Sequence, residues 1–192
     1  MNNKRAWREL ILSDAGILIL MGLINFALHM LTNGQYGFHR DELSFLDDAK
    51  NLAWGYTTYP PFTPFIVRVA LEIFGPTLIG LRFFSAVAMS TIMLLVGLMT
   101  RDLDGSRWSQ VIAAVAAGIA PAAMALSALY MYETYDYFWL VVVAYMVMRM
   151  LKSGNPRWWL GVGAAIGLGM ASWGSPFPAS LPSSWLRLGW PC

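Results

Sequence analysis

The sequence predicts an all-α protein, a polytopic bundle of transmembrane helices with interfacial amphipathic helices in its first outer loop. Three observations predict this fold class. Hydrophobic residues make up 57% of the 192-residue chain and charged residues only 12%, about half the charged share of soluble domains. Nine Trp, eight Tyr and ten Phe are typical of a protein anchored at two membrane–water interfaces. Several apolar runs also approach the length of a membrane span, so we expect an integral, multi-pass membrane protein.

Five segments are predicted to be full or partial spans, because a membrane helix requires about 20 mainly apolar residues. The first begins after a basic N-terminus, and no small-residue cleavage site follows it, so we expect it to be retained. Small residues fill the third, which favours close helix packing, and Pro121 in its second half can kink it. The predicted spans are residues 10–31, 78–99, 109–130 and 136–151, with a partial fifth at 158–171.

The long connection after the first span contains no spanning run. Its segment 41–54 has an amphipathic pattern and is expected to lie along the interface as a helix. Asp47 and Asp48 are interpreted as the wet face of this helix. The prolines of Tyr59-Pro60-Pro61-Phe62 fix a rigid extended turn. That turn either holds an aromatic edge beside a site or forms a corner between two interfacial helices.

The distribution of basic residues predicts the topology. Lys and Arg concentrate at the N-terminus, after the second span and after the fourth, so these segments are expected to be cytoplasmic. The connections on the other side are rich in acids, and both acidic clusters are therefore expected on the outer face. A net charge of +2 gives no reason to expect a nucleic-acid partner. One cysteine, Cys192, and two histidines make a disulfide framework or a zinc site improbable.

Candidate chemistry centres on Arg40-Asp41-Glu42, where the chain leaves the first span. Ionisable groups at a bilayer boundary are costly and suggest a functional site. Neighbours on a helix point about 100° apart, so the two acids would have different roles. A partly desolvated carboxylate suits a general base that takes a proton from a hydroxyl, and Arg40 could pair with phosphate. The alternative is a solvated helix start, whose acids complement the helix dipole.

Three further charged residues are candidates for the same site. Glu133 and Asp136 lie on the second outer connection, where they could complete an acidic pocket or a divalent-cation site with Asp41. They could equally complement the dipole of a helix N-terminus. Arg82, near the outer end of the second span, could snorkel to the headgroups or face the bundle and hold a lipid-linked phosphate.

Five short motifs in this order resemble a known family. The sequence is similar to bacterial polyprenyl-phosphate-dependent, type C membrane glycosyltransferases, akin to protein O-mannosyltransferases and the lipid A aminoarabinose transferase. The resemblance runs from about residue 10 to residue 170, and covers most of a segment 1–171 that we interpret as the N-terminal part of such a transferase. The motifs are Tyr36-Gly37-Phe38-His39-Arg40-Asp41-Glu42-Leu43, Leu52-Ala53-Trp54-Gly55-Tyr56, Tyr59-Pro60-Pro61-Phe62, Gly80-Leu81-Arg82-Phe83 and Arg101-Asp102-Leu103-Asp104-Gly105.

The resemblance implies a reaction and its residues. A sugar carried on a polyprenyl phosphate would be transferred, with inversion, to a lipid, glycan or protein acceptor at the outer face of a bacterial inner membrane. Asp41 would be the general base and Glu42 its neighbour, with Asp136 or Glu133 as the second acid. Arg82, with Arg40, would contact the lipid phosphate. The resemblance leaves open whether a divalent cation takes part.

The segment 172–192 departs from the family pattern. It is rich in Ser, Pro and Trp and has no long apolar run, whereas members of the family continue through many more spans. We expect a frameshift or premature stop near residue 171, and therefore a chain that is inactive alone; the alternative is a natural short protein. Two other classes remain open: a small transporter subunit, which should place ionisable groups near the membrane midplane, and a non-catalytic membrane scaffold.

Overall fold

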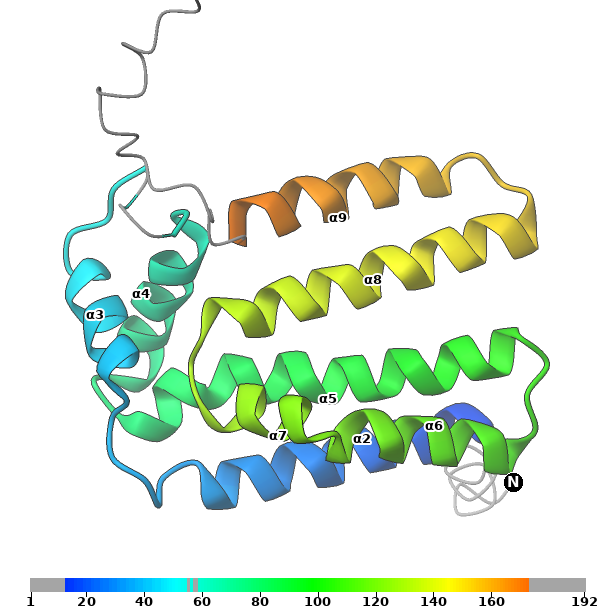
Figure 1. Cartoon of the computed structure of the whole chain (residues 1–192), viewed down its shortest axis with the longest axis horizontal. Helices are drawn as coiled ribbons and strands as arrows, with labels where there is room; N and C mark the ends of the chain where they lie inside the picture. The colour runs from blue at the N-terminus through cyan, green and yellow to red at the C-terminus, as the bar shows by residue number, and fades with distance from the viewer. Residues whose placement is uncertain (1–12, 55, 57–58, 173–192) are drawn as a thin grey trace, which may run out of the picture.

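The computed structural model describes residues 13–54, 56 and 59–172, and within these residues the fold is entirely helical, as predicted. The predicted segment 172–192 lies outside them except for Ser172, so its frameshifted origin stays a prediction. The eight described helices follow one another along the chain without strands between them (Figure 1). They are α2 (Asp14–Thr32), α3 (Arg40–Asp48), α4 (Phe62–Phe74), α5 (Leu78–Asp102), α6 (Arg107–Ile119), α7 (Pro121–Ala128), α8 (Tyr132–Ser153) and α9 (Trp158–Ser172).

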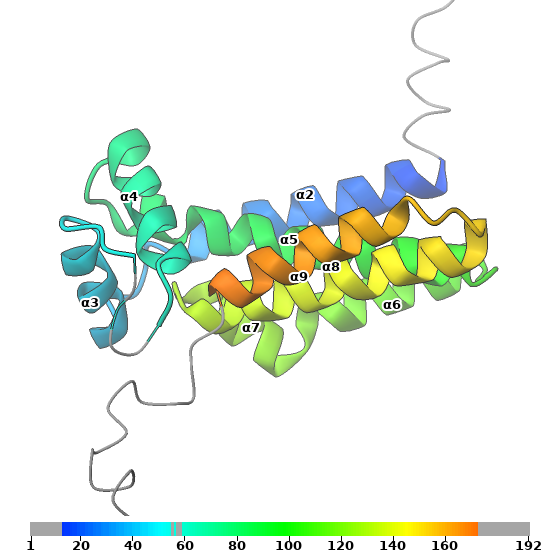
Figure 2. The same cartoon turned by 90° about the horizontal axis from the view of Figure 1, so that it is seen from above.

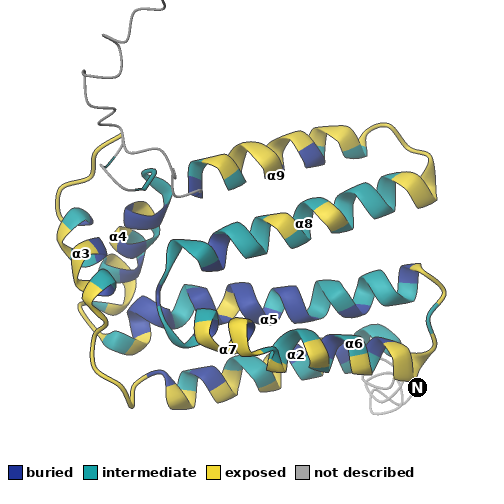
Figure 3. Ribbon diagram, viewed as in Figure 1, coloured by how far each residue is buried: buried dark blue, intermediate teal, exposed yellow. Residues whose placement is uncertain are grey.

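The long helices lie side by side and α5 is the central one. It packs against α2, α4, α6, α7 and α8, and Figure 1 shows α6 beside its C-terminal half and α4 at its N-terminal end. Figures 1 and 2 show α3 and α4 together across one end of the bundle, beyond the N-terminal end of α5. We call this the outer end, following the predicted topology. Figure 3 shows buried residues concentrated along α5, while α2 and α9 contain few buried residues.

Two described helices, α2 and α5, are long and apolar enough to cross a membrane, and the pair α6 and α7 is a third candidate if its halves cross together. These coincide with the predicted spans 10–31, 78–99 and 109–130. The predicted spans 136–151 and 158–171 correspond to α8 and α9. The same criteria of length and composition select neither of these two helices, so their crossing of the membrane stays a prediction.

The predicted effect of Pro121 is confirmed, because the helix breaks at Ala120 and the axes of α6 and α7 differ by 57°. Proline has no N–H to donate and its ring clashes with the preceding turn, so a continuous helix cannot pass through it. It is tolerated at the first position of a new helix, where the structure has it. The bend directs the chain toward α5 before it reaches the outer end.

At the outer end the first interfacial helix is shorter than predicted. Helix α3 ends at Asp48, whereas the amphipathic pattern extended to residue 54. The Tyr56 hydroxyl lies within hydrogen-bonding distance of the carbonyls of Asp48 and Asn51 (3.2 and 3.3 Å), and it accepts the N–H of Ala53. These contacts satisfy backbone groups that a longer helix would have paired, and they hold residues 49–54 in a turn. The Tyr59–Pro61 segment then leads directly into α4.

Charged side chains also pair at the opposite, inner end. Asp102 at the end of α5 accepts from Arg149 of α8 (3.2 and 3.3 Å), and Asp14 of α2 pairs with Arg107 of α6 (2.7 Å). Arg149 also lies over the Trp158 ring, 5.8 Å from its centroid. The ends of the long helices are therefore cross-linked by charge pairs, and the Arg101–Gly105 motif forms the turn that joins two of them.

Candidate functional site

The centre of the outer end is an ion pair between Glu42 of α3 and Arg82 of α5, both fully buried. Nε and Nη2 of Arg82 donate to the two carboxylate oxygens of Glu42, each over 2.8 Å. The same oxygens accept the backbone N–H groups of His39 and Tyr130, again over 2.8 Å. Burial by itself would raise the pKa of Glu42, but these four hydrogen bonds lower that pKa below its usual value.

The guanidinium of Arg82 uses its remaining N–H groups within the chain. Nη1 donates to the carbonyls of Asn33 (2.7 Å) and Tyr36 (3.4 Å), and Nη2 donates to the carbonyl of Gly37 (2.9 Å). A guanidinium has five N–H donors, and five hydrogen bonds to Glu42 and these carbonyls occupy them. The predicted contact of Arg82 with a lipid phosphate stays a prediction, and it would require one of these bonds to be exchanged.

Asp41 lies in a different environment from Glu42, although the two residues are adjacent. Its side chain is 39% exposed, 3.5 Å from Nε of Arg40 and 3.7 Å from Nδ1 of His39. Its backbone N–H donates to His39 Nδ1 over 3.4 Å, which caps the start of α3. The two adjacent side chains therefore point in different directions, as predicted. The Glu42 carboxylate is buried inside the bundle, and the Asp41 carboxylate is accessible.

Arg40 is the most accessible cation beside Asp41. Its side chain is 92% exposed, and its contact with the Asp41 carboxylate is at a surface. Such an arginine is free to turn toward an anion that approaches from outside. Asp47 is 81% exposed and pairs with Lys50, which fits its predicted place on the wet face. Asp48 instead accepts the hydroxyl of Tyr59, and burial, together with this bond, raises the pKa of that phenol.

The second acidic segment begins at Tyr130, between α7 and α8, and it meets the first through that residue. Besides donating its N–H to Glu42, the buried Tyr130 donates its hydroxyl to the carbonyl of Thr63 in α4 (2.8 Å). Its ring packs edge-on against Phe45 of α3 (5.8 Å between centroids). Sequence reasoning missed Tyr130, since an aromatic residue before a helix is common and nothing local marks its partners.

Glu133 and Asp136 lie in the first turns of α8, at the same end of the bundle as Asp41 (Figure 1). Burial raises the pKa of the Tyr132 phenol, and the negative charges of Glu133, Asp136 and Asp41 raise it further. Asp136 is half-buried and accepts the Ser172 hydroxyl over 3.3 Å. Glu133 and Asp136 therefore lie at the same end of the bundle as Asp41, and that this end is the outer one stays a prediction.

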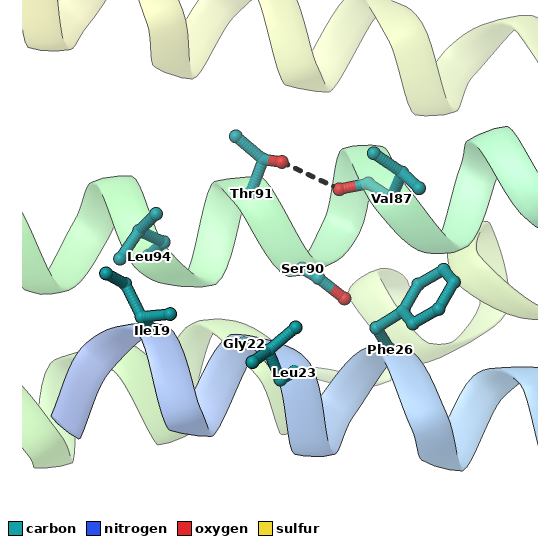
Figure 4. A pocket seen from close by; sticks show the side chains of 8 residues that line it. All are labelled: Ile19, Gly22, Leu23, Phe26, Val87, Ser90, Thr91 and Leu94. Atoms are coloured by element: carbon teal, nitrogen blue, oxygen red, sulfur yellow. Dashed lines mark hydrogen bonds between the residues drawn. The ribbon is translucent and has the colours of Figure 1, made fainter. Parts of the chain in front are cut away.

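The described residues contain no group of three or more His, Cys, Asp or Glu side chains placed to hold a metal ion. They do contain apolar hollows. One, of about 480 Å³, lies at the outer end and is lined by Trp54, Phe62, Phe65 and their neighbours. Another, of about 310 Å³, lies between α2 and α5, with Gly22 and Ser90 among its lining residues (Figure 4). None of the candidate charged residues lines either hollow.

The described helices include two or three that are long and apolar enough to cross a membrane, as in an integral membrane protein. Residues 58–176, more than half of the chain, match the model of the dolichyl-phosphate-mannose-protein mannosyltransferase family. The chain therefore belongs to this family, whose members act on a polyprenyl-phosphate sugar donor and an acceptor. Comparison with curated proteins and with solved structures gives no match. The matched range includes Arg82, Glu133 and Asp136, and it begins after Asp41 and Glu42.

Proposed function

We propose that the outer end of this chain is the site of a glycosyl transfer from a polyprenyl-phosphate sugar to an acceptor hydroxyl at the outer membrane face, with inversion. Asp41 is the general base. The observation that carries the assignment is the contrast between the two adjacent acids. Glu42 is fully buried and bonded to four donors, whereas Asp41 is accessible and has only longer contacts with Arg40 and His39.

The proposed step needs a base and a stabilised leaving group. Asp41 takes the proton of the acceptor hydroxyl as the acceptor oxygen bonds to the anomeric carbon of the sugar. The bond between that carbon and the phosphate oxygen breaks, and polyprenyl phosphate leaves with the electron pair. Arg40 can pair with the departing phosphate, because its guanidinium is exposed beside Asp41. Glu133 and Asp136 form the opposite, acidic side of the same site.

The placement of charge disfavours a transporter. Among the described residues of the bundle, ion pairs lie at the two ends, where α3 and α4 pack and where α5 meets α6 and α8. The middle of α2 and α5 is joined instead by a neutral hydrogen bond, from Asn25 to the Ser90 hydroxyl (3.2 Å). A transporter places ionisable groups near the membrane midplane, often beside broken helices. The break between α6 and α7 at Ala120 is a feature of that kind, but the ion pairs of the described residues do not lie beside it.

The experiment compares Asp41→Asn with Asp47→Asn, an exposed acid on the same helix. Because the 192-residue chain is expected to be inactive alone, the locus is first resequenced across the codons for residues 171–172. If another frame continues with apolar spans, both variants are made in the restored gene and in the short one.

Membranes containing each variant are supplied with a labelled polyprenyl-phosphate sugar, and released polyprenyl phosphate is measured. We expect Asp41→Asn to lower the rate at least about 100-fold, the scale of general base catalysis. Asp47→Asn should stay within about twofold of the parent, because its carboxylate is solvated. Transfer that survives Asp41→Asn at normal expression would remove Asp41 from the mechanism.

A further inference from the structure

Tyr130 and the pair of Glu42 and Arg82 stand apart from the proposed chemistry, because all three are fully buried. A side chain with no accessible surface cannot touch a substrate unless the fold opens. Their hydrogen bonds are short, between 2.7 and 2.9 Å for all but one of those described above. They therefore need another explanation than contact with the donor or the acceptor.

The Glu42 carboxylate joins parts of the chain that are far apart in sequence. Its donors come from α5, from the segment before α3, and from the connection between α7 and α8. The last of these is the backbone N–H of Tyr130, 88 residues away. Through Arg82 the same carboxylate is connected to the carbonyls of Asn33 and Gly37, in the segment that carries the chain to Asp41.

Tyr130 completes this connection on the side of the second acidic segment. Its hydroxyl is bonded to α4 through the Thr63 carbonyl, and its ring packs against Phe45 of α3 and Tyr135 of α8. Glu133 and Asp136 follow Tyr130 closely in sequence, in the first turns of α8. The position of Tyr130 relative to Glu42 consequently sets how far these acids lie from Asp41, the residue that follows His39 and Arg40 into α3.

We propose that Tyr130, together with Glu42 and Arg82, is a positioning residue that holds the second acidic segment against the first, with Glu42 acting through hydrogen bonds and not on the substrate. The value of this arrangement for catalysis rests on the proposed function. The hydrogen-bonded contact between the two acidic segments does not, and it can be tested whether or not sugar is transferred. It assigns Glu42 a role different from the catalytic one suggested by its place beside Asp41.

The test reports the position of the second segment directly, without a turnover assay. In a Cys192→Ser background, Met131→Cys places a thiol next to Tyr130, and Ala114→Cys places one in the buried inner half of the bundle. The purified full-length chain, in mild detergent, is exposed to a maleimide and the labelling rate of each thiol is measured. Tyr130→Phe and Glu42→Gln are each combined with both reporters, and Asp47→Asn is the matched control.

We expect Tyr130→Phe and Glu42→Gln to raise the labelling rate at position 131 about tenfold, the scale of losing one buried hydrogen bond to a charged or backbone group. Labelling at position 114 should stay within about twofold, and Asp47→Asn should change neither. Unchanged labelling at position 131 in both variants overturns the proposal. Equal increases at positions 131 and 114 in both variants also overturn it, because the residues would then hold the whole fold and not the segment.

A second readout separates positioning from simple stabilisation. In a form of the protein with measurable transfer, Tyr130→Phe should lower kcat about tenfold and leave the KM for the polyprenyl-phosphate sugar within about twofold. A misplaced acid slows chemistry, whereas a merely less stable protein loses active molecules and keeps its pH profile and its KM. A raised KM with an unchanged kcat would contradict the positioning role. Failure of the proposed function would instead appear as normal transfer in Asp41→Asn.

Discussion

Replacing Arg82 with methionine should destabilise the protein far more than the removal of any surface charge. The change deletes five hydrogen bonds and leaves the Glu42 carboxylate buried with only two backbone donors. Breaking a buried ion pair by removing one partner costs about 3–5 kcal/mol. The abandoned carbonyls of Asn33 and Gly37 add to this cost, though not in a simply additive way. We therefore expect a loss of at least about 3 kcal/mol, a large share of the 5–15 kcal/mol typical of a whole domain.

The assay is unfolding of the purified chain in detergent micelles by rising denaturant, followed by helical circular dichroism. The matched control is Arg68→Met, which removes an exposed i,i+4 pair with Glu72 and should cost less than about 1 kcal/mol. The double variant Glu42→Gln with Arg82→Met should recover part of the loss, because a buried amide is less costly than a lone carboxylate. If the free energy of unfolding of Arg82→Met lies within about 1 kcal/mol of the parent value, the pair of Glu42 and Arg82 does not hold the two segments together. That result would favour the alternative in which Arg82 serves a lipid phosphate.

The other predictions concern pH and the two ends of the bundle. The pKa of Glu42 is lowered in the folded state, so its ionised carboxylate contributes fully to stability above pH 4.5, its usual pKa, and this contribution is lost as the pH falls below that value. The denaturant midpoint of the parent should therefore fall at low pH, and that of Glu42→Gln should fall less. Gly105→Ala should cost about 1–3 kcal/mol, since its Cβ would lie 2.7 Å from Cγ2 and O of Thr100. Asp102→Asn should cost about 1–2 kcal/mol of stability, because it weakens the hydrogen bonds from Arg149. This cost lies between that of losing a buried ion pair and that of losing an exposed one.

Each of these has its own control. Gly163→Ala, where a Cβ would meet nothing within 4 Å, should be neutral or stabilising by up to about 1 kcal/mol. If it destabilises as much as Gly105→Ala, crowding is not the cause of the Gly105 effect. If the parent and Glu42→Gln lose stability equally at low pH, another carboxyl group is responsible. If the cost of the double variant Asp102→Asn with Arg149→Leu equals the sum of the costs of the two single variants, the pair is not coupled.

The helices and their membrane character could be predicted because they follow from local sequence. The second span is a continuous apolar run, and the break at Pro121 follows from the chemistry of one residue. The different environments of Asp41 and Glu42 were also predictable, since adjacent helical residues must point in different directions. The gathering of both acidic clusters at one end followed from the distribution of Lys and Arg alone.

The interior of the site could not be predicted, because its contacts join distant parts of the chain. Arg82 carries no local sign of whether it faces headgroups, a phosphate or a carboxylate 40 residues earlier. The partners of Tyr130 are set by the bend between α6 and α7 and by the packing of α4. The end of α3 was misplaced for a similar reason, since a tyrosine hydroxyl beyond the helix competes for its backbone groups.

The order of the two acids in α3 has a consequence for anyone who edits this motif. Exchanging Asp41 and Glu42 would conserve composition and net charge, yet it would put the shorter side chain in the buried position. One methylene less leaves the carboxylate unable to reach Arg82 and the Tyr130 N–H together. The longer acid would meanwhile occupy the accessible position, where its carboxylate would be displaced relative to the acceptor hydroxyl of the proposed reaction. The pair is thus directional, and its two halves cannot stand in for each other.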